Sequence, residues 1–433
     1  MKDTILKDFS KYVSLNILGM IGLSCYILAD TFFISKALGA TGIAALNLSI
    51  SIFSIINGIG LMLGIGGATR YSILQSQQEI KRANYVFTTS IKMGLILGII
   101  FLLIGLFGSD DLAILLGANY TTFPLTKTYL MTILCFAPFF ILNNIIVAFV
   151  RNDHNPKLAM IAMLSGSIAN IFLDYIFMFP LDMGMFGAAF ATSLAPVIGI
   201  GVSSIHFIKG KNSLSYTRCK MQLTRMADIV VLGLSAFINE ISSAITLIIF
   251  NLVILSLEGN LGVASYGIIA NLSLIGVAIF NGVAQGIQPL VSKGYGQRNV
   301  YLLKKVLKAA LITSLVIATI IYFITFTYSD GIIHIFNSEG SVEIARMSKI
   351  GLRIYFIGFF FAGINIIIAM YLSATESVKD AFLIALGRGC LIIIPMVLLL
   401  SKIWDMTGIW LAFVVTEVIV AAYSIYRQRR IDY

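Results

Sequence analysis

The sequence predicts an all-α integral membrane protein with twelve transmembrane helices in two six-helix lobes. Its 433 residues are 58% hydrophobic and only 12% charged, and the mean hydropathy is +0.95. A soluble globular domain would carry about 25% charged residues. The charged residues are also clustered, and two short sequence patterns recur in the second half. These observations exclude a water-soluble protein and indicate a membrane bundle of two related halves.

Charged or polar breaks separate twelve apolar segments. Each is long enough for a hydrocarbon core of roughly 30 Å, which about 20 helical residues cross. Lys2, Lys7 and Lys11 precede the first segment, which lacks a small-residue cleavage signal, so we expect an uncleaved helix. In chain order the predicted spans are 10–35, 43–75, 84–108, 124–150, 156–180, 184–208, 226–256, 261–293, 301–328, 345–373, 379–401 and 405–427.

The distribution of basic residues predicts that both termini are cytoplasmic. With the N-terminus inside, most Lys and Arg fall in cytoplasmic segments, as the positive-inside rule requires. Arg346, Lys349 and Arg353 run against the rule at the start of the tenth span. The net charge of +10 is therefore explained by orientation in a bacterial plasma membrane, and no nucleic-acid partner is expected.

The long polar connection from Lys209 to Asp228 separates six spans from six. We predict an N-lobe at 1–212, a cytoplasmic linker at 213–227 and a C-lobe at 228–433. An internal repeat supports two halves with the same orientation, an arrangement used by alternating-access transporters. The stretch that begins Gly39-Ala-Thr-Gly42 is echoed from Gly259, and the stretch that begins at Gly187 is echoed from Gly408.

Four acidic residues lie well inside predicted spans: Asp30, Asp174, Glu240 and Glu417. Each costs about 2.5 to 3.5 kcal/mol at a helix centre, so each should face protein or water and have a partner. Asn170 shares a helix face with Asp174, and the pair could coordinate one small cation or share a proton. At about 1.5 Å per residue, Asp30, Asp174 and Thr192 all reach the outer half of the bilayer.

Each carboxylate also has a structural interpretation. Asp30 could lie at the membrane interface, and Asp174 could hydrogen-bond a neighbouring helix. Glu240 would suit a cationic substrate, or it could be protonated and bonded to a helix backbone. For Glu417 we favour packing over a substrate contact. Arg70 and Arg388 are expected to snorkel or to pair with a carboxylate.

An enzyme has little support in the sequence. The four cysteines have neither metal-ligand nor redox spacing, and the three histidines are isolated. The glycines from Gly60 to Gly67 lie inside an apolar span without a preceding strand, which indicates close helix packing rather than a phosphate loop. We therefore expect no cofactor and no metal other than a coupling ion.

Several segments together resemble the multidrug and toxic compound extrusion (MATE) family, in its MepA-like and DinF-like branch. The resemblance covers essentially the whole chain. No segment is specific alone, but the set is. The segments are Ala29–Phe33, Arg151–Lys157, Asn170 with Asp174, Asn239 with Glu240, and Gln285–Pro289.

The resemblance implies a V of two six-helix lobes around a central cavity. It implies alternating access and export of amphipathic, often cationic drugs, by a monomer in membrane lipid, against an inward flow of H⁺ or Na⁺. It also implies site roles. The cation-coupling residues, which include a possible Na⁺ site at the first four, are Asp30, Asn170, Asp174, Thr192 and Tyr129. Glu240 is implied to face the cavity from the other lobe.

One departure from the family concerns the second lobe. Some relatives use an aspartate in the tenth span, but this chain has no acidic residue between Glu343 and Glu376. The repeat places no acidic residue opposite Asp30 or Asp174, so we expect coupling only in the N-lobe. The alternative functions are a flippase for lipid-linked oligosaccharides, a membrane enzyme and a purely structural membrane protein.

Overall fold

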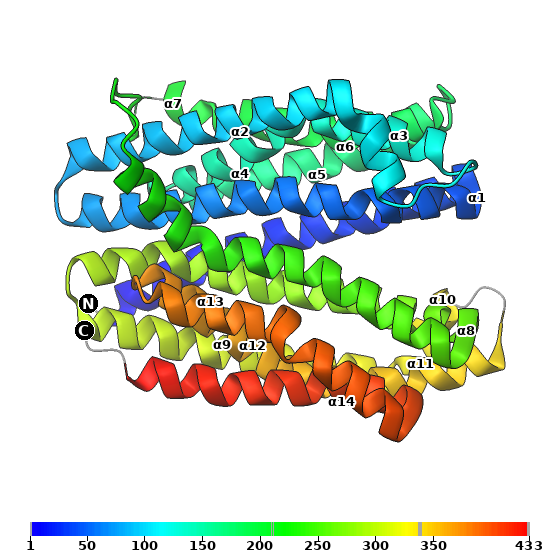
Figure 1. Cartoon of the computed structure of the whole chain (residues 1–433). Coiled ribbons are helices and arrows are strands. Elements are labelled where there is room, and N and C mark those ends of the chain that lie inside the picture. The colour runs from blue at the N-terminus through cyan, green and yellow to red at the C-terminus, as the bar shows by residue number, and fades with distance from the viewer. Residues whose placement is uncertain (1, 209, 211, 337–339, 431–433) are drawn as a thin grey trace. The chain divides into compact units, whose positions relative to one another are not determined.

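Helices account for nearly all of the described chain in the computed structural model (Figure 1). The structure describes residues 2–208, 210, 212–336 and 340–430, and these include no strand. The all-α prediction is therefore confirmed for this part of the chain. In chain order the first seven α-helices are α1 (Lys2–Ser76), α2 (Ile80–Leu115), α3 (Phe123–Cys135), α4 (Ala137–Asn152), α5 (Pro156–Met178), α6 (Gly184–Ser203) and α7 (Ile205–Ile208). They are followed by α8 (Leu223–Gly296), α9 (Val300–Thr327), α10 (Ser329–Phe336), α11 (Val342–Tyr355), α12 (Phe359–Ala374), α13 (Val378–Leu386) and α14 (Ile393–Arg429).

Helix packing divides the chain into two compact units. The N-terminal unit contains Leu18–Glu240 and Ser292–Gln297, and the C-terminal unit contains Met1–Ile17, Ile241–Val291 and Arg298–Tyr433. Helices α1 and α8 therefore contribute to both units. This division by packing does not test the lobe boundaries at 212 and 228, which remain a prediction.

Two long helices contain a glycine break at equivalent positions of the sequence repeat. Gly39 in α1 has φ 62° and ψ −153°, and Gly259 in α8 has φ 60° and ψ −150°. This region of backbone space is essentially restricted to glycine, because a Cβ would clash there. The repeat predicted from sequence is thus accompanied by the same backbone turn in both halves. Helix α14 has a third break, at Trp404 and Asp405.

Eight helical stretches of the described chain are long and apolar enough to cross a membrane, or nine if the α3–α4 pair, bent by 49°, is one span. The stretch Thr4–Ser76 has 73 residues, which at 1.5 Å per residue would measure about 110 Å without its break. A hydrocarbon core is only about 30 Å thick. The chain is therefore multi-pass, and the interrupted stretches are too long for a single crossing.

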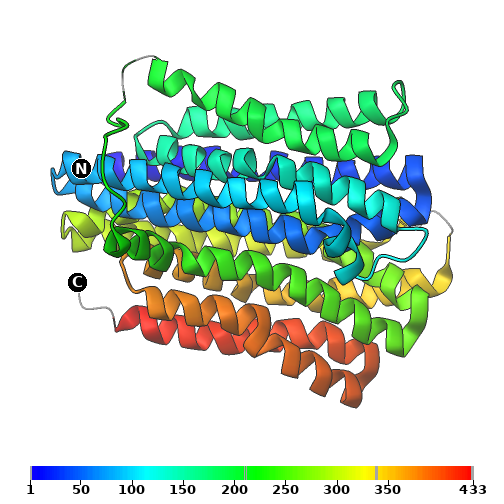
Figure 2. The ribbon, with the colours of Figure 1, turned by 45° about the horizontal axis from the view of Figure 1, so that its top comes forward.

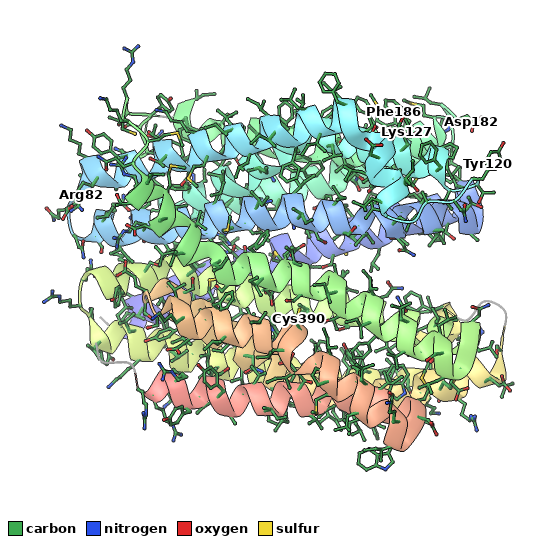
Figure 3. The ribbon with its side chains drawn as sticks, viewed as in Figure 1. Arg82, Tyr120, Lys127, Asp182, Phe186 and Cys390 are labelled. Atoms are coloured by element: carbon green, nitrogen blue, oxygen red, sulfur yellow. The ribbon has the colours of Figure 1, made fainter. Side chains whose placement is uncertain are left out.

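The two ends of the N-terminal unit carry different charged residues. Arg82 lies at one end, and Tyr120, Lys127 and Asp182 lie at the other (Figure 3). Lys127 pairs with Asp110 across 2.7 Å at the second end. The loops predicted to face opposite sides of the membrane do lie at opposite ends of this unit.

The basic group that ran against the positive-inside rule is compensated locally in the C-terminal unit. Lys349 on α11 pairs with Asp330 on α10 across 2.8 Å. The Arg353 guanidinium lies 4.8 Å from the centre of the Phe326 ring. These contacts stabilise the group locally, and the group still runs against the positive-inside rule.

Candidate functional site

Asp30 lies on α1 in the N-terminal unit with 6% of its surface exposed. Its Oδ1 atom is buried and has no hydrogen-bond partner among the described residues. An isolated buried carboxylate is costly, and it usually gains a proton, a cation or a partner. Asp30 therefore faces protein rather than solvent.

Asn170 and Asp174 share one face of α5, as their spacing predicted, and both are fully buried. With the Asn170 amide oriented to satisfy its neighbours, its nitrogen donates to Asp174 Oδ2 across 3.0 Å. The amide oxygen accepts from the Thr192 backbone N–H across 3.1 Å and from its hydroxyl across 3.3 Å. Asn170 therefore links Asp174 on α5 to Thr192 on α6, while Asp174 Oδ1 has no partner in the described chain.

Two tyrosines border these carboxylates. Tyr129 on α3 is buried, hydrogen-bonds the Thr192 side chain and lies within electrostatic range of Asp30 and Asp174. Tyr26, one helical turn before Asp30, interacts electrostatically with both carboxylates as well. Tyr26 was absent from the predicted set, although its spacing from Asp30 would have placed it on the same helix face.

The cluster offers oxygen ligands and little positive charge. Asp30 and Asp174 form no ion pair within the described residues, and their mutual repulsion favours uptake of one positive charge. Carboxylate, amide and hydroxyl oxygens also suit a small hard cation. The chemistry of this donor set, with its two unpartnered Oδ1 atoms, therefore suits a proton or a sodium ion. The described residues contain no cluster of His, Cys, Asp or Glu suited to a transition metal.

Glu240 lies on the part of α8 that belongs to the N-terminal unit. Its Oε1 accepts from the Asn57 amide across 3.0 Å, and Asn144 in turn donates to Asn57 Oδ1 across 2.9 Å. The partner is thus a side chain of α1 rather than a helix backbone. Tyr26 also lies within electrostatic range of Glu240, so this tyrosine interacts with all three carboxylates.

Glu417 is placed differently from the other candidates. It is 2% exposed inside the C-terminal unit, where Arg388 donates to it from Nη2 at 2.8 Å and from Nε at 3.0 Å. The Asn365 amide donates to Glu417 Oε2 across 2.7 Å. Arg388 belongs to a short π-helical segment, Gly387–Leu391. The pairing expected for Arg388 is confirmed, and the packing interpretation of Glu417 fits better than a substrate contact, which stays a prediction.

Asp153, at the end of α4, organises a second polar cluster that the sequence did not predict. Its Oδ1 accepts from the Tyr71 hydroxyl across 3.0 Å, and its Oδ2 lies 2.8 Å from His206 Nε2. The Ser213 backbone N–H donates to Oδ2 across 2.9 Å. Burial raises the pKa of Asp153, but the hydrogen bonds from His206, Ser213 and Tyr71 outweigh it, and the pKa is lowered. The only sequence signal was the segment Arg151–Lys157, which carried the family resemblance without a role.

A match to a protein-family model identifies the family of this chain. The model of the MatE family matches residues 16–176 and 235–399, which together exceed half of the chain. The chain belongs to the MATE family. The two matched segments each contain part of one repeat, in agreement with the recurring patterns and paired glycine breaks of this MATE transporter.

Curated relatives support the same assignment. The chain is 29% identical over 424 residues to the multidrug export protein MepA of Staphylococcus saprophyticus, covering 97% of this chain and 92% of the relative. It is 29% identical over 394 residues to MepA of Staphylococcus aureus, covering 90% of this chain and 86% of the relative.

Solved MATE structures share the fold. A mutant of the Vibrio cholerae MATE transporter VcmN is similar with a TM-score of 0.91 at 20% identity, covering 99% of this chain and 97% of that one. A transporter of the MOP superfamily from Pyrococcus furiosus, described as having a binding pocket of reverse polarity, gives a TM-score of 0.91 at 22% identity, with 98% and 95% covered. At these identities the likeness concerns the fold alone.

Proposed function

We propose that this MATE transporter exports amphipathic, often cationic drugs by antiport with H⁺ or Na⁺. The observation that carries the proposal is the pair of buried carboxylates, Asp30 and Asp174, each with one oxygen left without a hydrogen bond in the described chain. The similarity to MepA, a multidrug export protein, supports the drug substrate. The coupling ion is the only cofactor that we propose.

The proposed architecture has twelve membrane-spanning helices in two lobes, arranged as a V around a central cavity. Support comes from the nine stretches obtained when α3 and α4 form one span, together with the interruptions inside three long stretches at Gly39, Gly259 and Trp404–Asp405. Dividing those three stretches gives twelve crossings, an even number that puts both termini on the same side of the membrane. The distribution of basic residues favours the cytoplasmic side of the plasma membrane for both. We propose a monomer in membrane lipid as the functional form.

In the proposed mechanism, one positive charge binds between Asp30 and Asp174 in the outward-facing state. Neutralising the carboxylates removes their repulsion and changes how α1 packs against α5, which lowers the affinity for drug. The coupling is reciprocal, because each ligand shifts the equilibrium only by its differential affinity for the two states. Glu240, held by Asn57, would attract the cationic part of a drug.

The test is dye efflux from proteoliposomes under separate proton and sodium gradients. Asp30→Asn should abolish gradient-driven export while the protein stays folded, because an amide cannot gain a proton or balance a cation. Asp182→Asn is the matched control, since Asp182 is exposed at one end of the N-terminal unit (Figure 3). Full export by Asp30→Asn, or equal loss in both variants, would contradict the proposal.

A flippase for anionic lipid-linked sugars is the main competing function. Such a protein would need Arg and Lys around its substrate pyrophosphate. The three deep carboxylates of the N-terminal unit, Asp30, Asp174 and Glu240, make that region acidic instead. Binding of a lipid pyrophosphate in preference to a cationic dye by the purified protein would favour the flippase.

A further inference from the structure

The described part of the connection between α7 and α8 is bound to the N-terminal unit at several points. We call its described residues 212–220 the strap. Three of its backbone N–H groups, at every second residue, donate to side chains. These bonds run from Ser213 to Asp153 Oδ2 (2.9 Å), from Ser215 to Asn84 Oδ1 (3.1 Å) and from Thr217 to Thr88 Oγ1 (3.0 Å). A period of two is the repeat of an extended segment, so the strap docks as a single strand would.

Helix α2 supplies a matching stripe of polar groups. Asn84, Thr88 and Lys92 are spaced four residues apart and share one helix face. Asn84 and Thr88 are buried, and the Lys92 ammonium donates to the Cys219 carbonyl oxygen across 2.8 Å. Leu214 of the strap is buried in the hydrophobic core of this unit. The strap is therefore held both by hydrogen bonds to its backbone and by the burial of its Leu214 side chain.

The start of α8 is attached to the same helix. The Arg225 guanidinium lies 5.2 Å from the centre of the Tyr85 ring and donates to Thr89 Oγ1 across 3.4 Å. Both partners lie on α2, next to the stripe that binds the strap. In Figure 1 and Figure 2 the green connection descends beside the light-blue beginning of α2 to reach α8.

We propose that the strap is a fixed part of the N-terminal unit and stays docked on α2 throughout the transport cycle. A polar connection between two moving lobes would ordinarily be a flexible tether. Here the cytoplasmic end of α8 would instead move with α2, and any rearrangement between the units would be taken up further along α8. The docking itself does not depend on the proposed export, whereas its constancy through the cycle rests on that function.

The first arm of the test measures docking by trypsin cleavage after Arg218 and Lys220 of the purified protein. The variant Ser215→Pro/Thr217→Pro removes two N–H donors but keeps an extended backbone, because proline favours that conformation. Its matched control, Ser215→Ala/Thr217→Ala, keeps both donors. Each hydrogen bond contributes about 1 kcal/mol, or roughly fivefold, so cleavage should accelerate about 25-fold in the proline variant only. Equal cleavage of both variants would overturn the docking.

The second arm tests whether docking persists during transport. In a chain whose four native cysteines are replaced by serine, Asn84→Cys/Ser215→Cys would be oxidised to fasten the strap to α2. Dye export should be the same in the oxidised and reduced forms. Export by the reduced form alone would overturn the proposal, since the strap would then have to leave α2. If neither form nor the parent exports dye, the proposed function fails while the cleavage arm still decides docking.

Discussion

Replacing Glu417 by glutamine should destabilise the C-terminal unit, because the substitution removes the charge that neutralises Arg388. The pair is buried, with 11% of the Arg388 side chain and 2% of the Glu417 side chain exposed. Two of its nitrogen–oxygen distances are 2.8 and 3.0 Å. Glutamine keeps the volume and one acceptor oxygen, so the substitution removes the charge together with one of the two oxygens that accept hydrogen bonds from Arg388 and Asn365.

The magnitude follows from the geometry. Two unit charges about 4 Å apart attract each other by roughly 4 kcal/mol at an effective dielectric constant of about 20. Breaking a buried pair by removing one partner costs about 3 to 5 kcal/mol, because the remaining charge stays in the interior. Since glutamine keeps an acceptor for Arg388, we expect a loss of about 3 kcal/mol in the free energy of unfolding, at the low end of that range.

Unfolding by SDS titration in detergent micelles, followed by tryptophan fluorescence, measures this loss. The two tryptophans, Trp404 and Trp410, both lie in α14, and Trp410 is buried in the core of the C-terminal unit. The fluorescence signal therefore reports on the unit that contains the pair. Glu258→Gln is the control, because Glu258 is exposed in the same unit.

A second variant tests whether the unpaired charge causes the loss of stability. Arg388→Met/Glu417→Leu removes both charges and should recover most of the stability, because no buried charge is then left without its partner. The reasoning is wrong if Glu417→Gln falls within about 0.5 kcal/mol of the parent, the range of an ordinary surface substitution. It is also wrong if the double variant loses as much stability as the single one.

Three further predictions concern the N-terminal unit. Asp153→Asn should lower stability near neutral pH and flatten its dependence on pH in thermal unfolding scans. The lowered pKa of Asp153 contributes stability that is present above the ordinary aspartate value of about 3.9 and is lost as the pH falls through the folded value. Gly66→Ala should unfold at lower temperature than Gly108→Ala, because a Cβ at Gly66 would collide with the Ile229 backbone carbonyl oxygen, whereas the nearest atom to a Cβ at Gly108 is 3.8 Å away. Asn170→Leu should abolish ion-driven export in proteoliposomes, since it removes the amide that donates to Asp174. The variant should remain folded in detergent. Export at the parental rate would contradict this role of Asn170.

The sequence was sufficient to predict which site residues are neighbours when they lie on one helix or at one depth in the membrane. The four-residue spacing put Asn170 beside Asp174, and the helical rise put Thr192 at the same level. The repeat that begins at Gly39 and Gly259 was also predicted from the sequence, whereas the matching backbone conformation of these two glycines came from the structure. Sequence reasoning missed Tyr26, because burying a tyrosine in an apolar helix has no large free-energy cost that would mark it as a partner of Asp30.

Relationships that depend on the packing of distant helices were not readable from the sequence. The partner of Glu417 is Arg388, on another helix, and many pairings of buried charges would have satisfied the same electrostatic requirement. The strap is a second case, because its polar composition also describes an ordinary loop. The packing of α2 beside it places Asn84 and Thr88 where they accept hydrogen bonds from the Ser215 and Thr217 N–H groups.

The two buried settings of carboxylates explain why we propose coupling in the N-terminal unit only. Glu417 already has a permanent cation at hydrogen-bonding distance, so another positive charge would have to displace Arg388 or be repelled by it. Asp174 accepts a hydrogen bond from the Asn170 amide, and Asp30 and Asp174 form no ion pair in the described chain and each keep one unpartnered oxygen. Binding one positive charge there satisfies two buried oxygens and removes a repulsion at once. A coupling ion therefore gains most free energy at the site that has no built-in cation, and an arginine placed beside Asp30 or Asp174 should lock the transporter rather than assist it.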